Sequence, residues 1–257
     1  MRKKYFFFDI DGTLTDNKTH KIVPSAKRTL DQLKANGHFV SIATGRAHYK
    51  AVSFTDKINI HNIVCNGGGC IVIDDQVVNL QPIPLKESIH ILEQADQNHV
   101  GWLLALNDDD TVIMKDYRFL ETAGRRKELT TYLYDPSLDY HALPSIMKMY
   151  LAYTKEDEKN YPWINEVGSL RMFDEYVIYQ YDAKKDGILR MMEYLQAPIE
   201  DVVVFGDDTN DLVMFDPCWT SIAMGNGKEE LKKKATYVTD TNVNDGIEKA
   251  CRHFGWI

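Results

Sequence analysis

Two acidic residues follow an aromatic run near the start of this sequence. Asp9 and Asp11 are two positions apart, so an extended backbone turns both carboxylates toward the same side. Gly12 comes next and permits a turn that a residue with a Cβ resists. Two carboxylates held close together repel one another and favour a divalent cation, and Mg²⁺ prefers oxygen ligands. An Asp-Gly turn alone is common, but the buried run, both acids and Thr13 together indicate a site.

A second acidic cluster follows another apolar run. Residues 202–205 are Val-Val-Val-Phe, and directly after them come Asp207, Asp208, Asn210 and Asp211. The alternative interpretation of the cluster is a turn with a helix cap, because Asp and Asn favour both. The order of an apolar run followed by acids nevertheless repeats that of the first stretch.

Apolar runs without period-two alternation are typical of strands that are buried on both faces of a parallel sheet. Such runs occupy residues 5–8, 39–43, 63–65 and 202–205. Between the first two, the sequence predicts a capped amphipathic helix that begins at Pro24-Ser25 and stops at Gly37. This order predicts an α/β fold with a doubly wound parallel sheet, whose ligands bind at the carboxyl ends of the strands.

Polar residues also follow two other strands of this predicted sheet. Thr44 and Gly45 come after residues 39–43, where a hydroxyl and a backbone N–H can bind a phosphoryl oxygen. The alternative for Thr44 is an N-cap of the next helix. Asn66 and Gly67 come after residues 63–65, in a glycine run that also suits a hairpin turn.

Four stretches of the chain resemble, in order, the motifs of the haloacid dehalogenase (HAD) superfamily. Residues 9–16, DIDGTLTD, resemble the first motif, DxDGT[LV], and residues 41–46, SIATGR, resemble the second. The third motif is a lysine, and residues 206–211, GDDTND, match the fourth motif of the Cof-like branch, GDxxND. The resemblance covers essentially the whole chain, and it implies a Rossmann-like HAD core with an inserted α+β cap domain.

The resemblance implies a role for each acidic residue of the motifs. In phosphatases of this superfamily the first Asp is the nucleophile and the second is a general acid and base, which assigns these roles to Asp9 and Asp11. A carboxylate can form an aspartyl-phosphate, and a second acid can protonate the leaving oxygen. Asp207 is expected to bind Mg²⁺ together with Asp9 and the backbone carbonyl of Asp11, and Asp211 to support the metal shell or the lysine.

The remaining implied residues contact the phosphate or the substrate. Thr44 and a lysine complete the catalytic set, and the branch pattern Lys-x-x-Gly/Ala-Ile/Leu selects Lys184 over Lys185. Cations in a first helical turn oppose the helix dipole, so a lysine there is expected to have another partner. Further phosphate or substrate contacts are expected from Gly12, Gly45 and Asn210, and weaker candidates are Asn66, Gly67, Asp208 and Asn226.

The middle of the chain differs from the two ends in its pattern of predicted helices and strands. We expect a core domain of residues 1–82 and 183–257, and an inserted α+β domain of residues 83–182 that selects the substrate. In the insertion the patterns predict helices at 85–98 and 155–167, and strands at 101–106, 111–115, 146–152, 170–173 and 177–181. In the second core segment they predict an amphipathic helix marked by Ile188, Met191, Met192 and Leu195, a strand at 221–224, and helices at 228–235 and 245–254.

Composition limits the classes of function. The net charge of −8 argues against nucleic-acid binding, which usually requires a basic face. No apolar stretch is long enough to span a bilayer, and the acid at position 9 interrupts the only run near the N-terminus too early for a signal peptide. The four cysteines form no CxxC pair, which is typical of reduced thiols in a cytoplasmic protein.

These observations predict a Mg²⁺-dependent phosphatase that acts on a small phosphorylated metabolite such as a sugar phosphate. A phosphomutase uses the same residues, so only the products distinguish it. A dehalogenase is disfavoured because Asp11 as a proton donor suits an oxygen leaving group. A sensor that binds a sugar phosphate without turnover is the alternative from another class, and binding alone would not need Asp11. The sequence does not define the oligomeric state.

Overall fold

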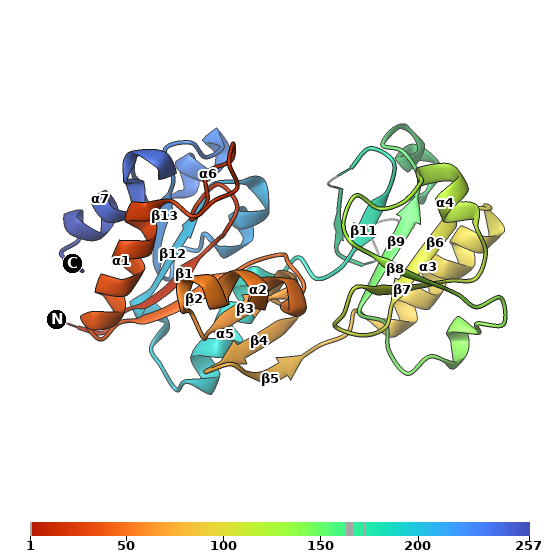
Figure 1. Ribbon diagram of the computed structural model, residues 1–257, viewed down its shortest axis with the longest axis horizontal. Helices are drawn as coiled ribbons and strands as arrows, with labels where there is room; N and C mark the ends of the chain where they lie inside the picture. Colours follow the sequence, from red (N-terminus) through yellow and green to blue (C-terminus); the bar gives the residue numbers. More distant parts are fainter. Residues whose placement is uncertain (1, 163–166, 172) are drawn as a thin grey trace. The chain divides into compact units, whose positions relative to one another are not determined.

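The computed structural model describes residues 2–162, 167–171 and 173–257. The chain divides into two compact units. The core unit contains residues 1–80 and 183–257, and the inserted unit contains residues 81–182. The core unit contains an eight-stranded sheet and the inserted unit a six-stranded sheet. Figure 1 shows that helices accompany the sheet in each unit. No helix in the described part of the chain is long and apolar enough to cross a membrane.

The core unit is built on a sheet whose strands run parallel except at one edge. The order across the sheet is β14 (Tyr237–Val238), β13 (Thr220–Ala223), β12 (Val202–Gly206), β1 (Tyr5–Phe8), β2 (Phe39–Ala43), β3 (Ile63–Cys65), β4 (Cys70–Ile73) and β5 (Gln76–Leu80). The pairs β3–β4 and β4–β5 at that edge are antiparallel. The central strand β1 has its carboxyl end beside those of β12 and β2, which places the residues that follow all three at one edge.

Helices cover both faces of the core sheet. One face packs against α1 (Pro24–Ala35), α2 (His48–Ile58) and α7 (Gly246–His253), and the other packs against α5 (Lys184–Tyr194) and α6 (Glu229–Lys234). Short 3₁₀ helices complete the unit: η1 (Asn66–Gly68), η5 (Ile199–Asp201), η6 (Thr209–Met214) and η7 (Asn242–Asn244).

The aromatic run of β1 is buried on both faces, as predicted, because Phe6 and Phe8 join one hydrophobic cluster and Phe7 joins the other. The predicted cap of α1 is wrong in detail. Pro24 is the first helical residue and Ser25 lies inside the helix, so no side chain caps it.

The inserted unit is an α+β domain with a mainly antiparallel sheet. Its strand order is β10 (Ser169–Leu170), β11 (Val177–Tyr179), β9 (Lys148–Ala152), β6 (Gly101–Ala105), β7 (Thr111–Met114) and β8 (Thr131–Tyr134), and only β7 and β8 run parallel. One face packs against α3 (Leu85–Gln97) and the other against α4 (Arg118–Ala123). A 3₁₀ turn, η2 (Tyr140–Ala142), precedes β9.

The helix predicted over residues 155–167 is wrong in the part that the structure describes. The segment forms only a 3₁₀ helix, η3 (Glu156–Asn160), and residues 163–166 lie outside the described residues. The side chain of Asp157 accepts hydrogen bonds from the backbone N–H and the hydroxyl of Thr154. Such local bonds compete with an α-helix. The 3₁₀ helix itself also contains no buried residue that would hold it against a core.

Candidate active site

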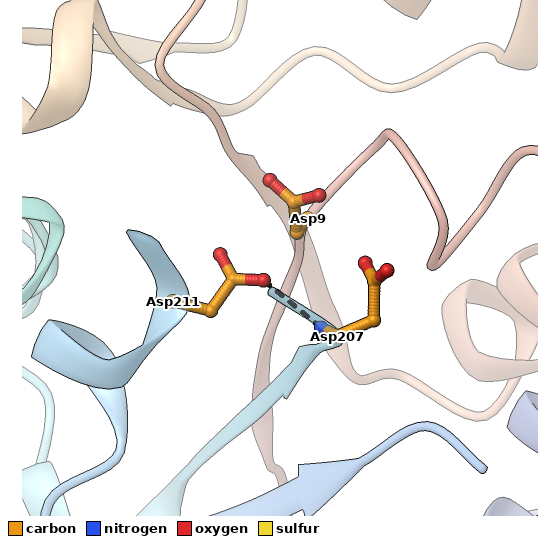
Figure 2. A group of neighbouring side chains, drawn as sticks. All are labelled: Asp9, Asp207 and Asp211. Carbon is orange, nitrogen blue, oxygen red and sulfur yellow. Dashed lines mark hydrogen bonds between the residues drawn. The ribbon is translucent and has the colours of Figure 1, made fainter. Parts of the chain in front are cut away.

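Three buried aspartates meet at the carboxyl ends of the central strands. Asp9 follows β1, Asp207 follows the neighbouring strand β12, and Asp211 lies in η6. Asp9 and Asp207 are each 7% exposed and Asp211 is 0% exposed. Their ligand atoms lie within 4.8 Å of one another, and Figure 2 shows the three carboxyl groups turned toward the same side.

Lys184 joins two of these carboxylates. It is the first residue of α5, and its Nζ donates to Asp9 Oδ1 at 2.7 Å and to Asp211 Oδ1 at 2.6 Å. Its neighbour Lys185 instead donates to Asp216 at 2.6 Å. The structure therefore places Lys184, and not Lys185, beside Asp9.

The electrostatics of this cluster are those of a site with too much negative charge. Burial, together with the nearby Asp211 carboxylate, raises the pKa of Asp9 to about 7 despite the ammonium of Lys184. Burial and the charges of Asp9 and Asp211 raise the pKa of Asp207 to about 8. Burial alone would lower the pKa of Lys184, but the two carboxylates outweigh it and raise that pKa. One cation thus faces three acids.

Asp211 organises the loop that carries Asp207. Its Oδ2 accepts from the backbone N–H groups of Asp207 at 2.9 Å and Asp208 at 3.2 Å. Because its Oδ1 accepts from Lys184, both of its oxygens already have donors. A Cβ at Gly206 would lie 2.7 Å from the side chain of Asp211, so this approach needs a glycine. These contacts suit Asp211 to a supporting role.

Asp208 is exposed and caps η6, accepting from Thr209 N at 2.7 Å. It lies outside the acidic group that the structure brings together among the described residues. The interpretation of this stretch as a helix cap therefore holds for Asp208. Asn210 follows on the same short helix and is half-buried.

The turn after β1 packs directly against Asp207. Gly12 has a φ of +85°, and a Cβ there would overlap the Asp207 carboxylate. Thr13 Oγ1 donates to Asp207 Oδ1 at 3.1 Å, and Asn226 Nδ2 donates to the Gly12 carbonyl at 2.8 Å. Asn226 in turn accepts from the backbone of Asn242 at 2.9 Å. Asn226, a weak candidate from sequence, thus holds the turn beside the acids.

Thr44 lies at the same edge of the sheet and is 2% exposed. It does not cap the next helix, because α2 begins at His48 with Ala47 in the N-cap position. Its Oγ1 accepts from Arg46 N at 3.2 Å, and its carbonyl accepts from Gly67 N at 3.2 Å. Gly45, between Thr44 and Arg46, is half-buried. The hydroxyl of Thr44 remains able to donate to a phosphoryl oxygen.

Asn66 and Gly67 form the tight turn after β3, where both have a positive φ, 51° and 62° respectively. The Oδ1 of Asn66 is buried and has no hydrogen-bond partner among the residues that the structure describes. Its backbone N–H donates to the Arg46 carbonyl at 2.8 Å, which ties this turn to the one after β2.

Asp11 differs from the three buried acids because its side chain is 57% exposed. Arg46 holds it through both carboxylate oxygens, with Nη2 2.7 Å from Oδ1 and 2.8 Å from Oδ2. The sequence prediction did not include Arg46, although it directly follows Thr44 and Gly45. Its position beside a predicted phosphate loop was the available signal.

The side chains that meet at this site are suited to a hard divalent cation, as the chemistry of their donor atoms shows. Asp9 and Asp207 offer carboxylate oxygens, which are the ligands that Mg²⁺ prefers. Burial, together with the charges of the neighbouring aspartates, raises the pKa of both carboxyl groups despite the ammonium of Lys184, and a bound cation would oppose this effect. Among the described residues, the side chain of Asp11 does not belong to the acidic group of Asp9, Asp207 and Asp211. The backbone carbonyl of Asp11 remains the predicted ligand.

Comparison with known proteins identifies the relatives of this chain. Residues 6–251 match the family model described as haloacid dehalogenase-like hydrolase. The Bacillus subtilis protein named "Putative phosphatase YkrA" is 32% identical over 258 residues, which cover 99% of each chain.

Two solved structures show the same fold along almost the entire chain. The phosphatase BT1666 from Bacteroides thetaiotaomicron, of the HAD superfamily, superimposes with a TM-score of 0.82 at 25% identity, over 99% of this chain and 96% of its own. The sugar phosphatase BT4131, of HAD subclass IIB, superimposes with a TM-score of 0.75 at 26% identity, over 99% of this chain and all of its own.

Proposed function

The chain belongs to the haloacid dehalogenase-like hydrolases and is a phosphatase, and from its site we propose that it hydrolyses a small sugar phosphate or similar ester through a Mg²⁺-dependent aspartyl-phosphate route. The single observation that carries the proposal is the surroundings of Asp9. This buried carboxylate lies 2.7 Å from the ammonium of Lys184 and within the acidic group that Asp207 completes. A nucleophile, a cation and a metal-ligand set thus share one edge of the sheet.

In the first half of the reaction, a carboxylate oxygen of Asp9 attacks phosphorus, and the bond from phosphorus to the ester oxygen breaks. Asp11 gives a proton to that departing oxygen, which leaves as an alcohol. Lys184 offsets the charge on the phosphoryl oxygens, and Thr44 donates to one of them. Since Asp11 is held by Arg46 in this structure, its carboxyl must release the guanidinium to reach the leaving group.

In the second half, Asp11 takes a proton from a water molecule whose oxygen attacks phosphorus. The bond between phosphorus and Asp9 breaks, which releases inorganic phosphate and restores both carboxyl groups. Asp9 and Asp207 would hold the Mg²⁺ ion with the Asp11 backbone. When bound, the ion supplies Lewis-acid polarisation of the phosphoryl group. Asp211 keeps Asp207 and Lys184 in place through the bonds described above.

We assign substrate selection to the inserted unit, residues 81–182. The core residues described above act on the phosphoryl group and on the oxygen that departs from it, so we assign recognition of the rest of the leaving group to the inserted unit. Exchange of this unit for that of a relative should change the preferred substrate more than the affinity for Mg²⁺. A collapse of Mg²⁺ affinity in the exchanged protein would contradict the assignment.

Phosphate release from a panel of sugar phosphates, nucleotides and an aryl phosphate tests the proposal. Wild type should release phosphate with Mg²⁺ and not with EDTA, and Asp9→Asn should be inactive while folded. Transfer of the phosphoryl group to a second sugar hydroxyl, without free phosphate, would instead identify a phosphomutase. Binding of a panel member with no product would identify a sensor.

A further inference from the structure

We propose that the glycine turn after β3, Gly67-Gly68, is the element that positions Lys184 for the reaction. The inference rests on the role of Lys184 in the proposed function. Nothing in the phosphoryl chemistry assigns a task to this turn, yet it lies against the start of α5. Three sets of contacts within the core unit connect the two.

The first set of contacts connects Thr44 to the start of α5, where Lys184 lies, through Gly67. Its backbone N–H donates to the Thr44 carbonyl at 3.2 Å, and its carbonyl accepts from Ala183 N at 2.7 Å. Ala183 directly precedes Lys184. One residue therefore fixes the distance between the residue that would bind the phosphoryl group and the residue that would neutralise it.

The second set is a close approach of two backbones. Gly68 has a φ of +103°, and a Cβ there would overlap the Ala183 carbonyl and lie 3.1 Å from Lys184 N. One turn further along α5, a Cβ at Gly187 would lie 2.8 Å from Gly68 Cα. Glycines on both sides thus let α5 rest directly on the turn.

The third set comes from Arg190 on α5. Its Nη2 donates to the Gly68 carbonyl, and its Nη1 donates to Asn79 Oδ1 on β5 at 3.0 Å. The guanidinium therefore holds the turn to α5 at the Gly68 carbonyl, whereas Ala183 N–H holds it at the Gly67 carbonyl. With backbone and side-chain bonds at both ends, the turn leaves the first residue of α5 little freedom.

Lys184 is held in one narrowly defined position, so this brace, the contacts of the Gly67-Gly68 turn and Arg190 with the start of α5, affects catalysis. Its side chain is 1% exposed, and its Nζ bonds two carboxylates at 2.7 and 2.6 Å. A shift of about 1 Å in its backbone would disturb this geometry, and misplacement of that size can lower a rate about 100-fold. Gly67 and Gly68 are accordingly positioning residues and do not touch the reacting atoms.

The decisive variant is Gly68→Ala, and the chain offers a matched control. Gly37 has a φ of +82° with nothing within 4 Å of its Cβ position, so Gly37→Ala also places a side chain at a positive φ but without the collision. We expect Gly68→Ala to lower kcat about 100-fold and to weaken inhibition by vanadate at saturating Mg²⁺. Gly37→Ala should leave both near wild type.

Arg190→Met provides a second variant that removes the side brace without adding an atom to the turn. Its control is Arg252→Met, which removes an exposed arginine that is paired with Glu248 on α7. In a Lys184→Met background, Arg190→Met should cause no further loss of vanadate affinity, because the brace acts through Lys184. A further loss of the same size as in wild type would overturn the inference.

Amide hydrogen exchange at Ala183 separates this inference from the proposed function. We expect faster exchange there in Gly68→Ala and Arg190→Met than in either control, because its bond to Gly67 is strained or lost. If wild type shows no turnover but exchange follows this order, the proposed function fails and the brace remains. If wild type is active but each variant matches its control in kcat and in exchange, the brace is wrong.

Discussion

The stability of the metal-free protein should fall as the pH rises, because of the carboxylates around Asp9. Burial raises the pKa of Asp9 to about 7 and the pKa of Asp207 to about 8, whereas unfolded aspartates titrate near about 4. Between these values the folded protein binds protons that the unfolded chain does not. A raised acid pKa therefore stabilises the fold fully below about pH 4, and this contribution is lost as the pH rises through about 7 and 8.

The magnitude follows from the number of protons involved. Each extra proton in the folded state lowers the free energy of unfolding by about 1.4 kcal/mol per pH unit. One such group contributes about 3 kcal/mol between about pH 5 and pH 7. The repulsion between Asp9 and Asp207 is a single interaction that both groups share, so their contributions to the free energy of unfolding do not add fully. We expect this free energy to fall by about 3 to 5 kcal/mol in total. For a unit of this size that is a fall of roughly 10 °C in Tm.

Thermal unfolding in EDTA across this pH range, on wild type beside Asp207→Asn, measures the effect. The variant removes one raised group and part of the repulsion on Asp9, so its Tm should fall less steeply. His38, whose pKa is lowered by burial, acts in the opposite direction, but it is common to both proteins and cancels in their difference. Mg²⁺ should stabilise wild type most at the upper end of the range, where it competes with fewer protons. A wild-type Tm that rises with pH, or that parallels the variant, would refute the reasoning.

Three further substitutions test the parts of the site. Lys184→Met should lower kcat about 100-fold or more and, in EDTA, destabilise the fold by about 3 to 5 kcal/mol, because it leaves buried carboxylates without their cation. Lys185→Met should have neither effect. Steady-state kinetics and urea unfolding compare the two variants, and equal effects would contradict the assignment. Gly12→Ala should reduce Mg²⁺ affinity, measured by calorimetry, because the new methyl group displaces the Asp207 carboxylate; unchanged affinity would remove Asp207 from the ligand set. Asn226→Ala should weaken the same affinity about 10-fold with little loss of Tm, since Asn226 orients the turn at Gly12 and its Nδ2 also donates to Asp207 Oδ2 at 3.5 Å. A large fall in Tm with normal affinity would show a purely structural role.

The parts of the site that could be predicted from sequence are those coded in short stretches. An apolar run followed by acids marks the carboxyl end of a buried strand, and this placed Asp9 and Asp207 at one edge before any pairing was known. The pattern after Lys184 likewise selected the lysine that the structure places beside Asp9. In each case neighbouring residues carry the signal.

The parts that could not be predicted depend on partners that are distant in sequence. The pairing of Asp11 with Arg46 needs the relative position of two loops, and the place of Arg46 directly after Thr44 and Gly45 does not show that its side chain reaches Asp11. The close approach of Gly68 to Ala183 spans more than a hundred positions and appears in the sequence only as a glycine run. The 3₁₀ helix Glu156–Asn160 is not distinguished from part of a longer α-helix by its sequence. Its residues are charged or polar, so the stretch has no apolar periodicity that would identify the type of helix.

The most direct test of the central claim is to trap the phosphoryl group on the enzyme. The best substrate of the panel is mixed with enzyme and Mg²⁺, quenched with acid within one turnover, and digested for peptide mass spectrometry. We predict a phosphoryl group on the peptide that contains Asp9, removed by hydroxylamine and absent from Asp9→Asn. Rapid turnover with no such adduct, or an adduct on another residue, would contradict the assignment of Asp9 as the nucleophile.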